Sequence, residues 1–275
     1  MNRHPLRDIT AEEVETYQRD GIVCLRQLFD PEWITFLRDL VDEDMAAPSE
    51  MSKNVNQKGA SGLFFFDTFV AHHLSGFMQA VLNGPGGEAA GRVMKADKAN
   101  LIFDQLLVKE PGTSTETLWH HDLTYWPVAG EQIATLWLAL DNVTSATGAV
   151  EYLKGSHRWG QKFLAVSFNP DEKYTENLPE VPDIEAERDQ HDIVSFDLAP
   201  GDCTIHHAAT LHHAPGNTSS DTRRRAYIQR WAGDDVVYNP RPNLMAIKSD
   251  PGIAAGATLD CELFPVAWRR NRDAA

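Results

Sequence analysis

The segment Trp119-His120-His121-Asp122 contains the residues of this chain best suited to binding a transition metal. His120 and Asp122 are two positions apart, so in an extended backbone their side chains leave the same face. A second histidine from a distant strand would complete the two-histidine, one-carboxylate set that holds Fe(II) and leaves coordination positions open. Because the chain has 11 histidines and 40 acidic residues, a His-x-Asp sequence alone is weak evidence. The rest of the chain must supply the context.

The second histidine is sought between residues 206 and 213, where four histidines lie in two short segments separated by a turn. At most one of them is needed for the metal set. We expect His212 to be the ligand, with His207 as its main rival. The other histidines near the two segments are expected to lie on the surface or to form hydrogen bonds: His121, His206 and His213.

A run of three arginines, residues 223–225, opens a later apolar segment. An arginine at the start of a strand, aimed into a pocket, binds a carboxylate through two parallel hydrogen bonds. A solvated turn is the ordinary environment of such a run, and we expect it for two of the three.

The first third of the chain has the pattern of helices. A capping box at residues 10–13 opens a helix that Gly21 is expected to end, and a short strand follows at residues 22–25. An N-cap aspartate and a proline at the first helical position then open an amphipathic helix over about residues 31–44. Residues 46–62 are polar and contain glycine, which predicts a loop.

From Leu101 onward the pattern changes to short strands separated by turns. The expected strands are residues 102–109, 133–140, 193–198 and 225–231. The acidic, proline-bearing residues 168–191 form a second long loop and, like the loop at 46–62, could cover a site. Helices followed by many short strands predict one domain, an antiparallel barrel or sandwich with helices packed outside.

The composition excludes several functions. A net charge of −15 and a pI near 5.1 argue against a general nucleic-acid binder or a binder of anionic membranes, but not against a small anionic ligand. The three cysteines are widely spaced and form neither a disulfide framework nor a zinc motif, which favours a reducing compartment. No apolar run approaches ~18 residues and no signal core follows the N-terminus, so we expect a cytoplasmic protein without a membrane span.

Several short blocks occur along nearly the whole chain in one characteristic order. They are residues 10–29, 104–112, 119–127, 137–144, Gly148, 155–158, Gly201-Asp202, His212, Asn217 and 224–226. Together they resemble the phytanoyl-CoA dioxygenase family of Fe(II)/2-oxoglutarate oxygenases. The resemblance implies a single oxygenase domain over residues 1–275, whose all-β core is a double-stranded β-helix of the jelly-roll or cupin-like type with flanking helices. Its parts would be a helical region at about 8–95, the barrel at about 100–235 and a C-terminal extension at 236–275.

The resemblance also implies roles for individual residues. His120, Asp122 and His212 would be the iron ligands, and Arg224 would bind the far carboxylate of 2-oxoglutarate. Gln105 and Trp137 would line the cosubstrate site, with Lys109 as a weaker candidate. For Trp137, a plain role in the barrel core is an equal alternative, because aromatic residues in alternating strands usually fill the interior.

Two departures from the family pattern concern the cosubstrate site. The family often has Gly-Ser after the distal histidine, where this chain has His213-Ala214, so a hydroxyl that could contact the cosubstrate is missing. The stretch from Asn217 to the arginines is one residue longer than usual, which leaves the register of the run open. Arg224 is preferred because it shares parity with Ala226 and Ile228, which are expected to face inward.

The implied reaction consumes 2-oxoglutarate and dioxygen, releases succinate and carbon dioxide, and oxidises a C–H bond of a small organic substrate, with ascorbate as the expected reductant. A carboxylate at position 122 favours hydroxylation, because related halogenases have a small residue there. Tyr125 and Trp126 are expected to line the substrate pocket, whereas residues 64–66 are expected mainly in the core.

Three alternatives to this function remain. An acyl-CoA hydroxylase would use the same mechanism, but only Lys53 and Lys58 could bind the CoA phosphates and the overall charge opposes them. A zinc hydrolase could use the same His-Asp-His set, and a non-enzymatic barrel could bind a ligand without reaction. Neither of these needs Arg224. The sequence gives no indication of oligomeric state.

Overall fold

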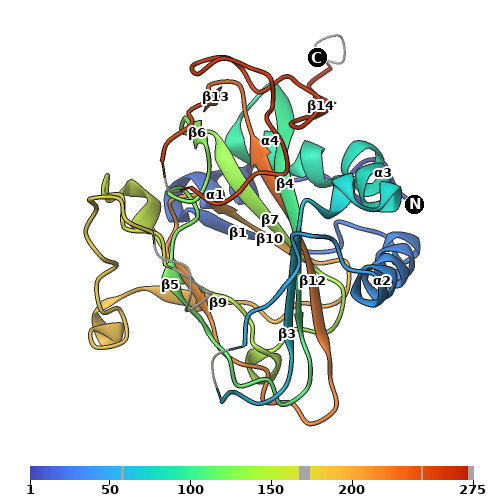
Figure 1. Cartoon of the computed structure of the whole chain (residues 1–275), viewed down its shortest axis with the longest axis vertical. Helices are drawn as coiled ribbons and strands as arrows, with labels where there is room; N and C mark the ends of the chain where they lie inside the picture. The colour runs from blue at the N-terminus through green and yellow to red at the C-terminus, as the bar shows by residue number, and fades with distance from the viewer. Residues whose placement is uncertain (57–58, 167–173, 243, 272–275) are drawn as a thin grey trace.

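Two antiparallel sheets face one another in the computed structural model, which describes residues 1–56, 59–166, 174–242 and 244–271 (Figure 1). The major sheet has the order β1 (Ile22–Leu25), β10 (Cys203–His207), β7 (Ile133–Ala139), β12 (Arg224–Ala232), β4 (Lys98–Lys109), β3 (Phe64–Thr68) and β2 (Lys53–Asn54), and β14 (Val266–Arg269) also pairs with β4. The minor sheet has the order β5 (Thr117–His120), β11 (His212–Ala214), β8 (Glu151–Leu153) and β9 (Ile193–Ser195). A small pair joins β13 (Val237–Tyr238) to β6 (Val128–Ala129). This is the predicted jelly-roll arrangement.

The N-terminal helices begin and end as predicted. In α1 (Ala11–Asp20), Thr10 Oγ1 accepts a hydrogen bond from the N–H of Glu13, whose carboxylate accepts one from the N–H of Thr10. Gly21 ends this helix in the left-handed conformation, with φ of 74°. Asp30 caps α2 (Pro31–Ala46) by accepting a hydrogen bond from the N–H of Trp33.

Helices cover the outer face of the major sheet. The remaining helices are α3 (Ser75–Asn83) and α4 (Gly86–Met94), with short 3₁₀ segments at Val70–His72, Ser145–Thr147, Ser156–Arg158 and Arg188–Gln190. In Figure 1, α2 and α3 lie on one side of the major sheet and β5 and β9 of the minor sheet lie on the other. Because the helices lie on the outer face of the major sheet, the space between the two sheets can hold a site.

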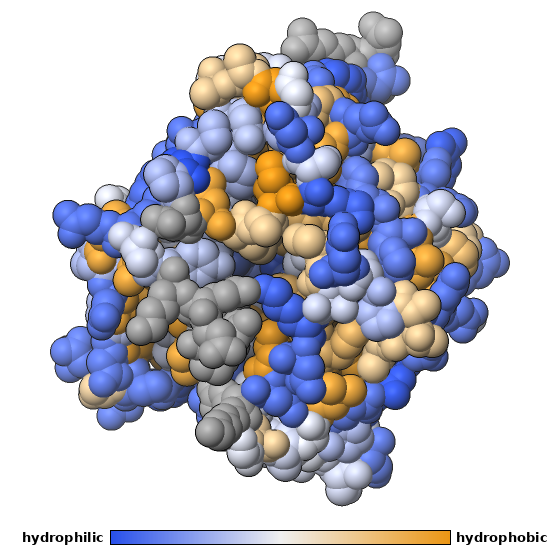
Figure 2. Space-filling view, in the orientation of Figure 1, coloured by the Kyte–Doolittle hydropathy of each residue, from blue (hydrophilic) through white to orange (hydrophobic). Residues whose placement is uncertain are grey.

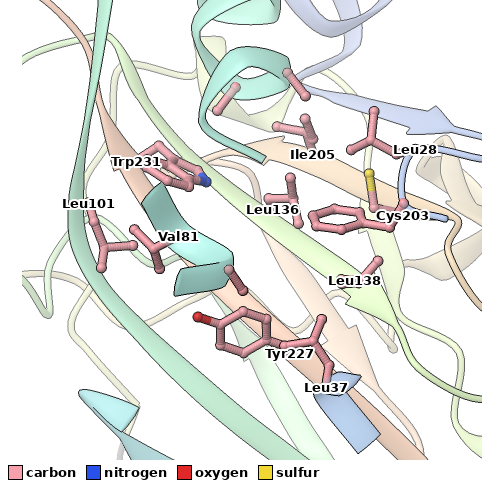
Figure 3. Packing of buried hydrophobic residues seen from close by; sticks show 14 of the residues in the cluster. Leu28, Leu37, Val81, Leu101, Leu136, Leu138, Cys203, Ile205, Tyr227 and Trp231 are labelled. Carbon is pink, nitrogen blue, oxygen red and sulfur yellow. The ribbon is translucent and has the colours of Figure 1, made fainter. Parts of the chain in front are cut away.

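Strand β12 shows how the sequence separates the core from this interior. Its alternate residues Tyr227 and Trp231 pack beneath the helices against Leu37 of α2 and Val81 of α3 (Figure 3). The intervening residues of β12 face the opposite way, because successive side chains of a strand alternate between its two faces. Arg224 and Arg230 both belong to this inward set, and both line the cavity between the sheets.

Some expected boundaries were wrong. The predicted loop at residues 46–62 contains the short strand β2, which pairs with β3. The predicted strand 193–198 ends at Ser195, because only its first residues pair with β8. Strand β4 begins at Lys98, four residues before residue 102, and its first residues pair with β14 from the C-terminal extension. Part of the predicted cover at 168–191, residues 168–173, lies outside the described residues.

The structure also describes the cysteine thiols and the apolar character of the helices. Cys24, Cys203 and Cys261 are all free thiols. Among the described residues, no helix combines the length and apolar character needed to cross a membrane.

Candidate active site

Strand pairing in the minor sheet brings the predicted metal ligands together. His120 at the end of β5 lies directly opposite His212 at the start of β11, and their ring centroids are 4.1 Å apart. Asp122 follows β5 by two residues, and its Oδ1 lies 3.8 Å from His120 Nε2 and 4.0 Å from His212 Nε2. One donor atom from each residue lies within 4.8 Å of the others, and all three residues are buried. This cluster can hold one metal ion.

The hydrogen bonds of both imidazoles fit a metal site. His120 Nδ1 lies 2.7 Å from the carbonyl of Leu118, and His212 Nδ1 lies 3.0 Å from the carbonyl of Thr210. A carbonyl accepts only, so each Nδ1 carries the proton and each Nε2 keeps its lone pair for a metal. Burial lowers the pKa of His120, and burial with the neighbouring His120 lowers the pKa of His212, so both stay neutral.

Asp122 uses its two oxygens differently. Oδ1 faces the two histidines, whereas Oδ2 accepts a hydrogen bond from Thr135 Oγ1 at 2.7 Å and lies 3.4 Å from His206 Nε2. Although burial alone would raise it, the pKa of Asp122 is held well below its usual value, first by the contact with His206 and then by the nearby His212 imidazole and the cation of Arg230. The carboxylate is therefore ionised and oriented. Three donors of this chemistry, with the rest of the cluster open to a cavity, fit Fe(II).

The other histidines separate as follows. His207, the rival ligand, instead contacts the carbonyl of Glu131 and is not part of the cluster. His121 accepts a hydrogen bond from the N–H of Phe163, and His213 stacks on Trp119. His206 was expected to lie at the surface or to form a hydrogen bond. Instead it is 2% exposed and packs against His212, with their ring centroids 4.4 Å apart.

A second cluster of possible ligands lies at the surface. Glu151, Glu185 and His213 approach one another, but Arg188 donates hydrogen bonds to both glutamates. These carboxylates are therefore already neutralised by a side chain of the protein, and the buried cluster is the better metal site.

Of the three consecutive arginines, only Arg224 faces the cavity. It is 1% exposed, its guanidinium lies 5.5 Å from the ring centroid of Trp137, and its Nε has no hydrogen-bond partner in the described part of the chain. Arg225 forms a two-point ion pair with Asp141, and Arg223 pairs with Glu110 and Asp42. Burial lowers the pKa of Arg224 to about 10, so it remains a cation at neutral pH.

Two other candidates for the cosubstrate site lie on β4. Lys109 is opposite Arg224 in the sheet, but its Nζ donates to the carbonyl of Pro215 at 2.7 Å and it is not part of the cavity wall. Burial, reinforced by Arg224, lowers the pKa of Lys109 to about 6. Gln105 does line the cavity, where its Oε1 accepts a hydrogen bond from Arg230.

The cavity has a volume of about 460 Å³, and Figure 2 shows the molecule hollowed near the centre of the view. Tyr125 and Trp126 line it, as predicted. The three phenylalanines of β3 divide by alternation, because Phe64 and Phe66 line the cavity and Phe65 packs into the core under the helices. Trp137 lines the cavity and also belongs to a buried cluster, so its contact with the cosubstrate stays a prediction.

The sequence assigned no role in the site to several cavity residues, and three polar ones among them are Thr135, His206 and Arg230. Strand parity could have found Arg230, because it shares the inward face of β12 with Arg224. His206 and Thr135 lie opposite one another on β10 and β7, and nothing local in the sequence links either residue to Asp122.

The fold and the site together define a jelly-roll protein with a two-histidine, one-carboxylate cluster, able to hold a metal ion, inside its cavity. The chain belongs to the phytanoyl-CoA dioxygenase (PhyH) family, whose profile matches residues 17–226.

Individual relatives agree with this assignment. An ectoine dioxygenase from Sphingopyxis alaskensis is 22% identical over 260 residues, covering 88% of this chain and 84% of the relative. The phytanoyl-CoA dioxygenase of Arabidopsis thaliana is 26% identical over 279 residues, covering 85% and 95%. Among solved structures, the α-ketoglutarate-dependent carbocyclase SnoK from nogalamycin biosynthesis has a TM-score of 0.77 at 22% identity, covering 98% of this chain and 100% of its own.

Proposed function

We propose that this protein is an Fe(II)/2-oxoglutarate-dependent dioxygenase that hydroxylates, or otherwise oxidises, a C–H bond of a small organic molecule. The observation that carries the proposal is that one cavity contains both a metal set and a buried cation that has no ion-pair partner among the described residues. His120, Asp122 and His212 form the first, and Arg224 is the second. A zinc hydrolase or a simple binding barrel would have no use for the cation, whose burial is costly without an anion.

Each residue has a defined task in this proposal. His120, Asp122 and His212 would hold the iron, and Arg224 would donate hydrogen bonds to the far carboxylate of 2-oxoglutarate. Trp137, beside Arg224, would pack against the methylenes of the cosubstrate. When bound, iron with 2-oxoglutarate and dioxygen supplies the oxidant for the C–H bond.

The cavity walls favour a free organic molecule over a CoA thioester. Phe103, Tyr125, Trp126 and Met245 give the substrate region an apolar surface, which binds an organic body and keeps water away from the reacting atoms. Lys53 is the one lysine in the wall among the described residues, and Lys58 lies outside them. Several basic residues at the entrance would be expected for the phosphates of CoA.

The proposal is tested by spectroscopy and by product analysis. Fe(II) and 2-oxoglutarate, added without oxygen, should give a weak charge-transfer band in the visible region, and oxygen should then yield succinate. Arg224→Gln should require a much higher 2-oxoglutarate concentration for the same band, whereas Arg223→Gln should not. A wild-type protein that gives neither band nor succinate contradicts the proposal, whatever its substrate.

A further inference from the structure

A second buried guanidinium, that of Arg230, lies in the same cavity without an assigned task. Only 8% of Arg230 is exposed. Its Nη2 donates a hydrogen bond to Gln105 Oε1, whereas Nε and Nη1 have no partner in the part of the chain that the structure describes. A guanidinium with five N–H donors is therefore largely unsatisfied in a buried position. Unpaired buried donors normally indicate a missing partner.

Asp122 and Asp104 lie near enough to Arg230 to interact with its charge, but each carboxylate has other partners. The guanidinium lies 4.6 Å from the ring centroid of Phe103 and 5.8 Å from that of Trp126. Asp104 instead accepts hydrogen bonds from Tyr227 Oη and from the N–H of Ala71, and Asp122 belongs to the metal set. Among the described residues, no carboxylate forms an ion pair with Arg230.

The charge of Arg230 persists in this environment. Burial lowers the pKa of Arg230 to about 10, so the side chain is a cation at neutral pH. A buried cation without a paired anion is costly, and it is retained where a ligand supplies the anion.

The position of Arg230 separates it from the cosubstrate clamp. It is six residues after Arg224 on β12, so the two backbone positions are about 20 Å apart in a strand. In the sheet, Arg230 lies opposite Thr135, whose hydroxyl donates to Asp122. At this separation, a 2-oxoglutarate molecule whose far carboxylate is held by Arg224 would leave Arg230 available for a second anion in the same cavity.

We propose that Arg230 binds the carboxylate of the primary substrate, so that the enzyme oxidises organic acids with an apolar or aromatic body. The rings of Phe103 and Trp126 lie beside the guanidinium and also provide apolar surface for the body of the acid. The fixed guanidinium selects for an anion and places the acid against the metal set. This inference rests on the proposed function, because it presumes that Arg224 is engaged by 2-oxoglutarate.

The test uses two matched series of probes, because the natural substrate is unidentified. Phenylalkanoic acids from phenylacetate to 6-phenylhexanoate, and the corresponding primary amides, are titrated calorimetrically into anaerobic protein saturated with Fe(II) and 2-oxoglutarate. Saturation prevents the acids from occupying the Arg224 site. The variants are Arg230→Met, Arg230→Lys and, as a control that removes one outward-facing positive charge from the same part of the chain, Arg223→Met.

The wild type and Arg223→Met should bind at least one acid roughly tenfold or more tightly than its amide. Arg230→Met should lose this preference, Arg230→Lys should restore part of it, and all variants should retain the wild-type affinity for 2-oxoglutarate. The inference is overturned if no acid binds the wild type, if acid and amide bind equally, or if Arg230→Met keeps the preference. It is also overturned if the main effect of Arg230→Met is weaker binding of 2-oxoglutarate. The charge-transfer band of the wild type separates these outcomes from failure of the proposed function, which would abolish the band itself.

Discussion

Thr135 Oγ1 donates a hydrogen bond to Asp122 Oδ2 at 2.7 Å, and the other oxygen of that carboxylate faces His120 and His212. Thr135 comes from the major sheet and the two histidines from the minor sheet, so this contact connects the sheets at the metal set. Because a carboxylate can rotate about its last bond, an oriented oxygen requires such a partner. Thr135 is thus a positioning residue for the metal ligand.

Replacing this hydroxyl should weaken metal binding. Thr135→Val keeps the shape but removes the hydrogen bond, and we expect the affinity for Fe(II) to fall roughly 10- to 100-fold, as for other partners of metal ligands. Thr135→Ser should retain most of the affinity. Anaerobic titration with Fe(II) measures both variants. A Val variant that binds iron as tightly as the wild type would show that Asp122 is oriented by other contacts.

The choice of histidine ligands is tested by single substitutions. His120→Ala and His212→Ala each remove a ligand, so both should abolish iron-dependent turnover of 2-oxoglutarate. His121→Ala and His213→Ala should retain most of it, since their side chains contact Phe163 and Trp119 instead. Activity is followed as succinate release. If His207→Ala inactivates the enzyme and His212→Ala does not, the distal ligand has been misassigned.

Arg224→Ala should raise the apparent KM for 2-oxoglutarate roughly tenfold or more, because losing one partner of a buried, charge-assisted pair costs about 2–5 kcal/mol. Arg223→Ala should change this KM by less than a factor of a few. Arg225→Ala breaks the ion pair with Asp141, so it should lower thermal stability while leaving the KM near the wild-type value. The assignment of Arg224 would be contradicted if the KM rose steeply for Arg223→Ala or Arg225→Ala and stayed unchanged for Arg224→Ala.

A buried acid away from the site should make stability depend on pH. Asp44 is fully buried in α2, where burial and the nearby Asp67 raise its pKa to about 7, although His73 lies 3.9 Å away. The folded protein holds this proton and the unfolded chain does not between about pH 4 and 7, so this contribution to stability is present below pH 4 and is lost as pH rises through 7.

Asp44→Asn should remove this dependence. We expect a higher melting temperature than the wild type at pH 8 and little difference near pH 4, with a gain of a few kcal/mol at most, because each pKa unit corresponds to about 1.4 kcal/mol. Scanning calorimetry across this range is the measurement. An equal effect of the substitution at both pH values would mean that Asp44 does not titrate in this way.

Local patterns predicted the N-terminal helices, because their signals are local. The hydrogen bonds of the capping box join Thr10 to a residue three positions away, and Gly21 acts on the helix directly before it. Boundaries of strands such as β9 depend on how far a partner strand extends. That information is not present in residues 193–198 themselves.

The candidate site shows the same division. His120 and Asp122 share a face by local geometry, but His212 joins them through the pairing of β5 with β11, which the order of the family's sequence blocks indicated and periodicity could not. Parity selected Arg224 over its neighbours and would have selected Arg230 by the same reasoning. The surroundings of His206 could not be predicted, because they depend on how the two sheets face each other.

Asp122 is proposed to be a ligand of an iron centre that consumes 2-oxoglutarate. The most direct measurement is the rate of succinate formation by the wild type and by Asp122→Ala with matched Fe(II), ascorbate and oxygen. The wild type should form succinate, and Asp122→Ala, which lacks one of three ligands, should have lost most or all of this activity. Equal rates in the two folded proteins would remove Asp122 from the metal centre and contradict the account.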